Sequence, residues 1–146
     1  MSTKYPIISV TGSSGAGTTS VRHTFEHIFR RENVNAAFVQ GDAFHRYDRE
    51  AMEAAMAAAA ARGDQNFSHF GEHEELFRSY AETGRGRTRA YVHDAEDAEI
   101  FGAPVGSFTP WEEIPPDTDV LLYEGLHGAV ITKDVNVARY ADLKIG

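Results

Sequence analysis

Short apolar runs alternate along this chain with segments that have helical spacing or high helix propensity. Four runs have the length and continuity of strands buried in a sheet: residues 5–11, 36–40, 119–123 and 141–145. Three segments predict helices: residues 18–32, 52–62 and 72–82. Because strands alternate with helices, the sequence predicts an α/β domain with a mostly parallel sheet flanked by helices.

The remaining segments predict less regular structure. We expect a loop, an extended ribbon, an acidic solvated stretch, an irregular excursion and a short helix, in that order: residues 64–71, 85–93, 94–99, 101–116 and 134–139. No repeat or linker divides the chain, so we expect residues 1–146 to form a single domain. The chain ends at Gly146, inside an expected buried strand. This favours the N-terminal part of a longer domain over a strand that simply ends the sheet.

Composition narrows the class of protein. The 146 residues are 42% hydrophobic, which is enough for one domain with a core. The formal net charge of −8 argues against broad binding to nucleic acid or to a membrane surface, but not against a nucleotide. The absence of cysteine excludes disulfides and thiolate metal sites in this chain and suits the cytoplasm. No apolar run approaches a membrane span or a signal peptide.

The stretch from Ile7 to Thr19 has the order strand, glycine-rich turn and helix that is typical of a phosphate-binding loop. It fits the pattern G-x-x-x-x-G-K-[ST] except that Thr18 stands at the lysine position. Glycines let the N–H groups of the loop and of the helix N-terminus face an anion. The expected phosphate-binding residues are Gly12, Ser13, Ser14, Gly15, Ala16, Gly17, Thr18 and Thr19. An ordinary glycine-rich turn is the alternative, and the spacing disfavours a dinucleotide-binding turn.

A polar stretch, GDAFHRYDR, follows the second expected strand. Parallel α/β sheets bind ligands at the carboxyl ends of their strands, where this stretch is expected to lie. Asp42 could accept a proton from a substrate hydroxyl, and His45 and Arg49 could hold an anionic group. The alternatives are that Asp42 caps the following helix and that His45 is an ordinary surface histidine.

The stretch DVLLYEGLHG is an apolar strand that ends in Glu124. A carboxylate at a strand end is the Walker-B arrangement, which holds Mg²⁺ directly or through water. The hydroxyl of Thr19 would be its partner. The candidate metal ligands are therefore Thr19 and Glu124, with Asp42 at the neighbouring strand end. A carboxylate that caps the turn at Gly125 is the alternative.

Seven stretches together resemble phosphoribulokinase of the bacterial (proteobacterial) type: ISVTGSSGAGTT, GDAFHR, FSHF, GRTRAYVHD, FTPWEEI, LLYEGLHGAV and ADLKIG. The bacterial family also carries threonine at the lysine position of the loop. The resemblance implies a P-loop kinase fold. It also implies transfer of the γ-phosphoryl group of ATP to the 1-hydroxyl of ribulose 5-phosphate, which gives ribulose 1,5-bisphosphate for carbon fixation. Family members are longer than this chain and continue past ADLKIG.

The resemblance also implies roles for particular residues. Asp42 would be the catalytic base and Glu124 the acid that supports Mg²⁺. His45, Arg49 and His93 would bind the sugar phosphate, and ATP and Mg²⁺ would be the cofactors. Arg31 lies where the bacterial enzymes use an arginine in their response to a nucleotide effector. A homo-oligomer activated by NADH is the corresponding expectation.

Two other classes of function remain open from the sequence. A uridine or pantothenate kinase shares the loop and the acid after the second strand, although the pair His45 and Arg49 and the stretch YEGLHG disfavour it. A nucleotide-binding module without catalysis would bind ATP and show no sugar-dependent turnover.

Overall fold

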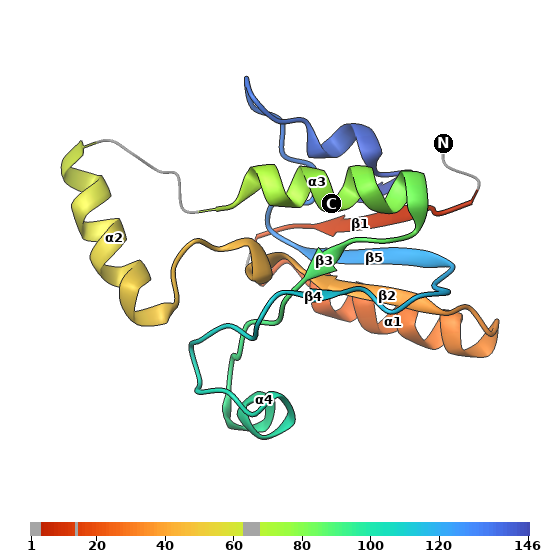
Figure 1. Ribbon diagram of the computed structural model, residues 1–146, viewed down its shortest axis with the longest axis horizontal. Coiled ribbons are helices and arrows are strands. Elements are labelled where there is room, and N and C mark those ends of the chain that lie inside the picture. The colour runs from red at the N-terminus through yellow and green to blue at the C-terminus, as the bar shows by residue number, and fades with distance from the viewer. Residues whose placement is uncertain (1–3, 14, 63–67) are drawn as a thin grey trace.

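A four-stranded parallel sheet forms the centre of the computed structural model, which describes residues 4–13, 15–62 and 68–146 (Figure 1). Its strands are, in spatial order, β2 (Ala36–Gln40), β5 (Val120–Gly125), β1 (Ile7–Thr11) and β6 (Leu143–Ile145). Glu124 of β5 is in register with Val10 of β1 on one side and with Gln40 of β2 on the other. The carboxyl ends of these three strands therefore meet at one edge.

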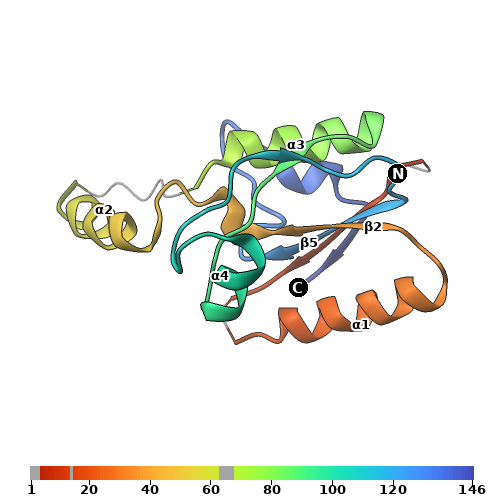
Figure 2. The same cartoon turned by 60° about the horizontal axis from the view of Figure 1, so that its bottom comes forward.

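Two helices cover opposite faces of the sheet (Figure 2). Phe29 of α1 (Thr18–Arg31) packs against Val10 and Leu122. On the other face, α3 (Phe70–Thr83) packs Phe77 and Tyr80 against the sheet. Because successive side chains of a strand point to opposite faces, β5 is buried from both sides, as its apolar sequence predicts. The expected α/β architecture is confirmed.

The other elements lie around this core. α2 (Arg49–Arg62) extends away from the sheet, beyond the carboxyl ends of the strands (Figure 1). The remaining elements are the 3-10 helices η1 (Gly41–Phe44) and η2 (Val137–Tyr140), the helix α4 (Ala95–Phe101) and the antiparallel ribbon of β3 (Arg87–Thr88) and β4 (Glu112–Glu113). Within the described residues, no helix is long and apolar enough to cross a membrane.

The acidic stretch of residues 94–99 is largely exposed, as expected, but most of it belongs to a helix, α4, that the sequence analysis did not predict. Asp94 caps α4 by accepting a hydrogen bond from the Asp97 N–H at 3.0 Å, and Gly102 ends the helix in the left-handed conformation. These two caps define where the short helix begins and ends, which the acidic composition of the segment does not indicate.

Several other boundaries differ from the expectation. α2 begins three residues early, at Arg49, because the Asp48 carboxylate accepts from the Ala51 N–H at 2.8 Å. Only two residues of the expected ribbon form β3, and its partner β4 comes from the expected irregular excursion. The short helix is shifted to η2. Residues 64–67 of the expected loop lie outside the described residues, and α3 begins at Phe70.

The strand β6 was expected to be buried, and it is not. It pairs with β1 alone and stands at the edge of the sheet, where Leu143 is 46% exposed. An edge strand has a neighbour on only one side, so its apolar residues are covered less than those of β5.

Candidate active site

The ends of β1, β2 and β5 are held together by close backbone contacts. The N–H of Gly12 donates to the carbonyl oxygen of Gly125 at 3.3 Å. A Cβ added to Gly125 would lie 2.7 Å from the Cα of Gly41, so only glycine fits where β2 and β5 end. Asp42 and Glu124 each neighbour one of these glycines, and their side chains therefore arise from adjacent strand ends.

The glycine-rich loop between β1 and α1 suits an anion. Gly15 and Gly17 have φ values of 82° and 87°, and no atom lies within 4 Å of the position of a Cβ on either. Gly17 precedes α1, and no side chain among the described residues caps the helix, so the first-turn N–H groups can face an anion. Among the expected residues, Ser14 lies outside the described part of the chain. The donors of the loop and helix fit a phosphate group.

Glu124 meets a hydroxyl of this loop, but not the expected one. The Oγ1 of Thr18 donates to the Oε1 of Glu124 at 2.5 Å, whereas Thr19 is exposed. Thr18 is the first residue of α1 and occupies the position of the usual lysine, and its side chain there reaches the carboxylate of Glu124. The described residues contain no group of three or more metal-binding acidic or histidine side chains. A carboxylate beside a hydroxyl still fits Mg²⁺, which is commonly held by one or two carboxylates and by phosphate oxygens.

Asp42 lies in η1, immediately past β2, among imidazoles. Its Oδ2 lies 2.8 Å from the Nε2 of His93, and its Oδ1 lies 3.6 Å from the Nε2 of His45. The residue at the N-cap of η1 is Gln40, and no side chain caps that helix, which leaves no support for the capping alternative. The structure thus joins Asp42 and His45 to His93, which is 51 residues away along the chain.

Arg49, the first residue of α2, lies next to the same site. Its Nε donates to the Tyr91 hydroxyl at 3.2 Å, and one terminal nitrogen donates to the His93 carbonyl oxygen at 3.1 Å. Beside it is a pocket of about 220 Å³, lined by His45, Tyr47, Asp48, Arg49, Met52, Glu53 and Tyr91. A guanidinium has further N–H groups to offer to an anion there.

Arg89 shapes the site, although the sequence analysis gave it no role. It donates to the carbonyl oxygens of Ala43 and His45 at 2.8 and 2.7 Å, and its guanidinium lies over the rings of Phe108 and Trp111. Burial lowers the pKa of Arg89, although the nearby Glu72 opposes this. Arg89 therefore holds the backbone of the Asp42–His45 turn at two points, Ala43 and His45. The alternating polar residues of RGRTRAY were a signal, but they did not distinguish this arginine from its neighbours.

His127 is a second residue that the sequence analysis missed. Burial lowers its pKa, the charge of His45 lowers it further, and Asp42 opposes the change. Burial raises the pKa of Tyr123, and the carboxylates of Asp42 and Glu124 add to this. The carboxylates of Asp42 and Glu124 therefore both lie near this buried tyrosine.

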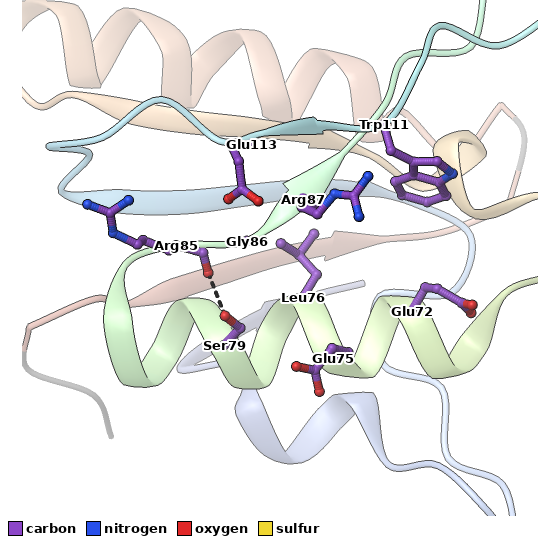
Figure 3. A pocket seen from close by; sticks show the side chains of 9 residues that line it. All are labelled: Glu72, Glu75, Leu76, Ser79, Arg85, Gly86, Arg87, Trp111 and Glu113. Carbon is purple, nitrogen blue, oxygen red and sulfur yellow. Dashed lines mark hydrogen bonds between the residues drawn. The ribbon is translucent and has the colours of Figure 1, made fainter.

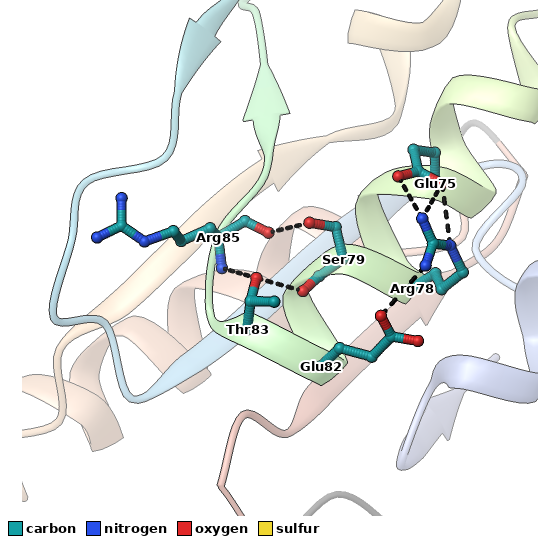
Figure 4. A network of polar contacts seen from close by, with 6 residues as sticks. All are labelled: Glu75, Arg78, Ser79, Glu82, Thr83 and Arg85. Atoms are coloured by element: carbon teal, nitrogen blue, oxygen red, sulfur yellow. Dashed lines mark hydrogen bonds and ion pairs between the residues drawn. The ribbon is translucent and has the colours of Figure 1, made fainter.

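A second pocket lies away from this site, between α3 and the β3–β4 ribbon (Figure 3). It has a volume of about 500 Å³ and includes none of the residues expected from the sequence to be functional. Next to it, Arg78 bridges Glu75 and Glu82 on the exposed surface of α3, and the Ser79 hydroxyl donates to the Arg85 carbonyl oxygen (Figure 4). The Ser79–Arg85 hydrogen bond ties the segment that leads into β3 to the end of α3, whereas the contacts of Arg78 stay within α3.

Comparisons with known proteins agree with this fold. A model of the phosphoribulokinase / uridine kinase family matches residues 7–146. Phosphoribulokinase of Nitrobacter vulgaris is 59% identical over 150 residues, which cover 98% of this chain and 52% of the relative. The chromosomal phosphoribulokinase of Cupriavidus necator is also 59% identical, over 100% of this chain and 52% of its own length.

A solved structure gives the same result. The phosphoribulokinase from Rhodobacter spheroides superimposes with a TM-score of 0.80 and 51% identity, over 98% of this chain and 50% of that chain. The chain spans about half the length of the curated relatives it matches. Because the family model covers nearly all of it, this chain belongs to the phosphoribulokinase / uridine kinase family.

Proposed function

We propose that this protein phosphorylates D-ribulose 5-phosphate at its 1-hydroxyl with ATP, which gives ribulose 1,5-bisphosphate for the Calvin cycle. The observation that carries the proposal is Asp42, which follows β2 at the sheet edge that also holds the glycine loop and Glu124. Relatives that are 59% identical and are named phosphoribulokinase support the choice of substrate.

Each part of the site would have a defined task. ATP and Mg²⁺ supply the transferable phosphoryl group and the cation that neutralises its charge. The N–H groups of residues 15–19 would hold the β-phosphate, and Glu124 with Thr19 or Thr18 would hold the metal. Asp42 would take the hydroxyl proton, because phosphoryl transfer depends on positioning and on a correctly placed base. Asp42 could also contribute to the metal site.

The sugar phosphate would bind on the α2 side of Asp42. His45, Arg49 and His93 supply donors around Asp42 and the adjoining pocket. A guanidinium and imidazoles suit a dianionic phosphate group. ATP and ribulose 5-phosphate are metabolites of the cytoplasm, where we propose that the protein acts.

The proposal is tested by measuring ADP formation with Mg²⁺ and either ribulose 5-phosphate or uridine as acceptor. Because the relatives are about twice as long, the assay uses this chain and a chimaera that continues into the remaining half of the Nitrobacter vulgaris relative. Turnover that depends on ribulose 5-phosphate supports the proposal. ATP binding without turnover in either protein would leave a nucleotide-binding module, and turnover with uridine alone would identify a different kinase.

Asp42→Asn is the decisive variant. We expect kcat to fall by roughly 10²–10⁴-fold, the contribution of a general base, while the Kd for ATP stays nearly the same. Asp134→Asn is a matched control, because Asp134 is exposed, lies outside the site, and has no recorded side-chain contact with Asp42 or with the loop. Near-normal kcat in Asp42→Asn would remove Asp42 from the chemistry.

Assembly and regulation complete the proposal. The family resemblance suggests a homo-oligomer that responds to NADH through Arg31. Arg31 is an exposed residue at the end of α1 and pairs with Glu32 at 2.9 Å. Light scattering measures the oligomer, and kcat with and without NADH in Arg31→Ala tests the response.

A further inference from the structure

We propose that Asp97 is a positioning residue, which holds the imidazole of His93 in the orientation that presents Nε2 to the catalytic carboxylate of Asp42. This inference rests on the proposed function of Asp42. It adds a residue from α4 that touches neither the glycine loop nor the metal-binding carboxylates in any recorded contact.

The contacts of His93 show how it is held. The Asp97 Oδ2 accepts a hydrogen bond from the His93 main-chain N–H at 3.0 Å and lies 3.3 Å from the ring Nδ1. On the opposite side, the Nε2 of the ring lies 2.8 Å from the Asp42 Oδ2. The imidazole therefore lies between two carboxylates, and Asp97 fixes both its backbone and its ring.

The side chain of His93 needs such support because it is 43% exposed. A ring with one hydrogen bond and an open surface can rotate and turn Nε2 away from its partner. Two further contacts hold the segment around His93. Arg49 donates to the His93 carbonyl oxygen, and the rings of Tyr91 and His93 pack edge to face with their centroids 4.8 Å apart. Neither contact acts on the ring nitrogens. Apart from Asp42 itself, Asp97 is the described residue that contacts a ring nitrogen of His93, and it therefore holds the ring from the side opposite Asp42.

The helix α4 places Asp97 for this task. Asp94, directly after His93, accepts from the Asp97 N–H and caps the helix, which brings the first turn back over His93. The sequence H-D-x-x-D thus builds its own support: the first aspartate begins the helix and the second reaches the histidine.

The orientation matters for the chemistry of Asp42. A hydrogen bond from Nε2 to Oδ2 occupies one oxygen and fixes the plane of the carboxylate. The Oδ1 lies 3.6 Å from His45, beyond hydrogen-bond distance, and is the oxygen left to accept a proton from a substrate hydroxyl. Loss of Asp97 would leave Asp42 in place but let its carboxylate turn.

The variant Asp97→Asn tests this proposal, with Glu96→Gln as the matched control. Both residues lie in the first turn of α4, so both variants remove the same charge near the helix N-terminus, but Glu96 is exposed and has no recorded contact with His93. We expect Asp97→Asn to lower kcat about tenfold with an unchanged KM for ATP, by analogy with the lower end of the range for carboxylates that orient metal-bound histidines. Glu96→Gln should leave kcat unchanged.

A double-mutant cycle separates positioning from general stability. In a His93→Gln background, Asp97→Asn should cause no further fall in kcat, because its effect passes through the imidazole. An equal fall in both backgrounds would overturn the proposal, as would an equal fall in Glu96→Gln.

A measurement without turnover separates this proposal from the proposed function. Long-range ¹H–¹⁵N spectra of the 146-residue chain report the two ring nitrogens of His93. We expect one well-defined set of ring-nitrogen signals for His93, which Asp97→Asn disperses and Glu96→Gln preserves. If the chain and its chimaera have no kinase activity, the spectra still test Asp97. An unchanged His93 spectrum in Asp97→Asn would overturn the proposal whether or not the kinase is active.

Discussion

His73 is a polar residue in the aromatic core directly below the site. Its ring stacks on the rings of Phe44 and Tyr123, with centroid distances of 4.7 and 4.6 Å, and the residue is 1% exposed. Its Nε2 is buried without a hydrogen-bond partner among the described residues. Burial lowers the pKa of His73 from 6.5 to about 3, and the charge of His127 lowers it further. The imidazole is therefore held neutral between the segments that carry Asp42 and Glu124.

This burial predicts loss of stability in mild acid. The folded state resists protonation of His73 down to about pH 3, whereas the unfolded chain takes up the proton near pH 6.5. The unfolded state thus binds more protons in this window, so the free energy of unfolding falls as the pH falls. Between pH 7 and pH 5, the free energy of unfolding of His73→Leu should fall by about 2 kcal/mol less than that of the wild type. Urea denaturation at both pH values measures this.

The control for this prediction is His23→Gln on the exposed face of α1, where the side chain is 62% exposed. It should keep the acid sensitivity of the wild type. Identical pH dependence in His73→Leu and wild type would contradict the assigned cause.

Single residues of the site differ in how far the sequence could identify them. Asp42, His45 and Glu124 could be found because they lie at the end of an apolar strand or in the few residues after it. Arg89 could not, because its hydrogen bonds go to backbone carbonyls 44 and 46 residues away. The choice of Thr18 rather than Thr19 as the partner of Glu124 depends on the rotation of the first turn of α1, which the motif leaves open.

At the scale of elements, the contact between Gly41 and Gly125 sets the spacing of β2 and β5. We expect Gly125→Ala to destabilise the fold by about 1–3 kcal/mol, because the new methyl group would meet the backbone of Gly41 at 2.7 Å. The two strand ends would have to separate, which would also move Asp42 relative to Glu124. Thermal denaturation and kcat measure the two effects.

Gly71→Ala is the matched control for Gly125→Ala. Gly71 lies in α3, and no atom of the described residues is found within 4 Å of the position of its Cβ. This variant should stabilise the helix by up to about 1 kcal/mol. A Gly125→Ala protein as stable as wild type would show that the strand ends tolerate the separation.

The elements themselves were predictable to different degrees. β2 and β5 were found because each is a continuous apolar run, and α1 because its apolar residues repeat at helical spacing. α4 was missed because its cap, Asp94, lies within an acidic stretch that we interpreted by composition alone. The β3–β4 ribbon was only half predicted, since β4 has just two residues, Glu112 and Glu113, and is defined by its partner.

At the scale of the whole molecule, the glycine loop, α1 and Glu124 are all present in this chain and should bind a nucleotide together. Free MgATP at 100 times its Kd would raise the free energy of unfolding by about 2.7 kcal/mol. For a domain of this size the Tm should rise by about 5–10 °C. A thermal-shift assay measures this, and AMP, which lacks the β-phosphate, should give a smaller shift. Equal shifts with AMP and ATP, or none with either, would contradict the assignment of the loop.

The sequence by itself determined the alternation of strands and helices, the phosphate loop and the two strand-end carboxylates, because each depends on residues that are near neighbours in the chain. Only the tertiary structure decided which distant groups complete the site. His93 reaches Asp42 across 51 residues, and Arg89 reaches the same turn from the ribbon segment. Such contacts depend on how the segments after α3 fold back over the sheet edge. Local spacing carries no information about that path, and the packing of the whole chain fixes it.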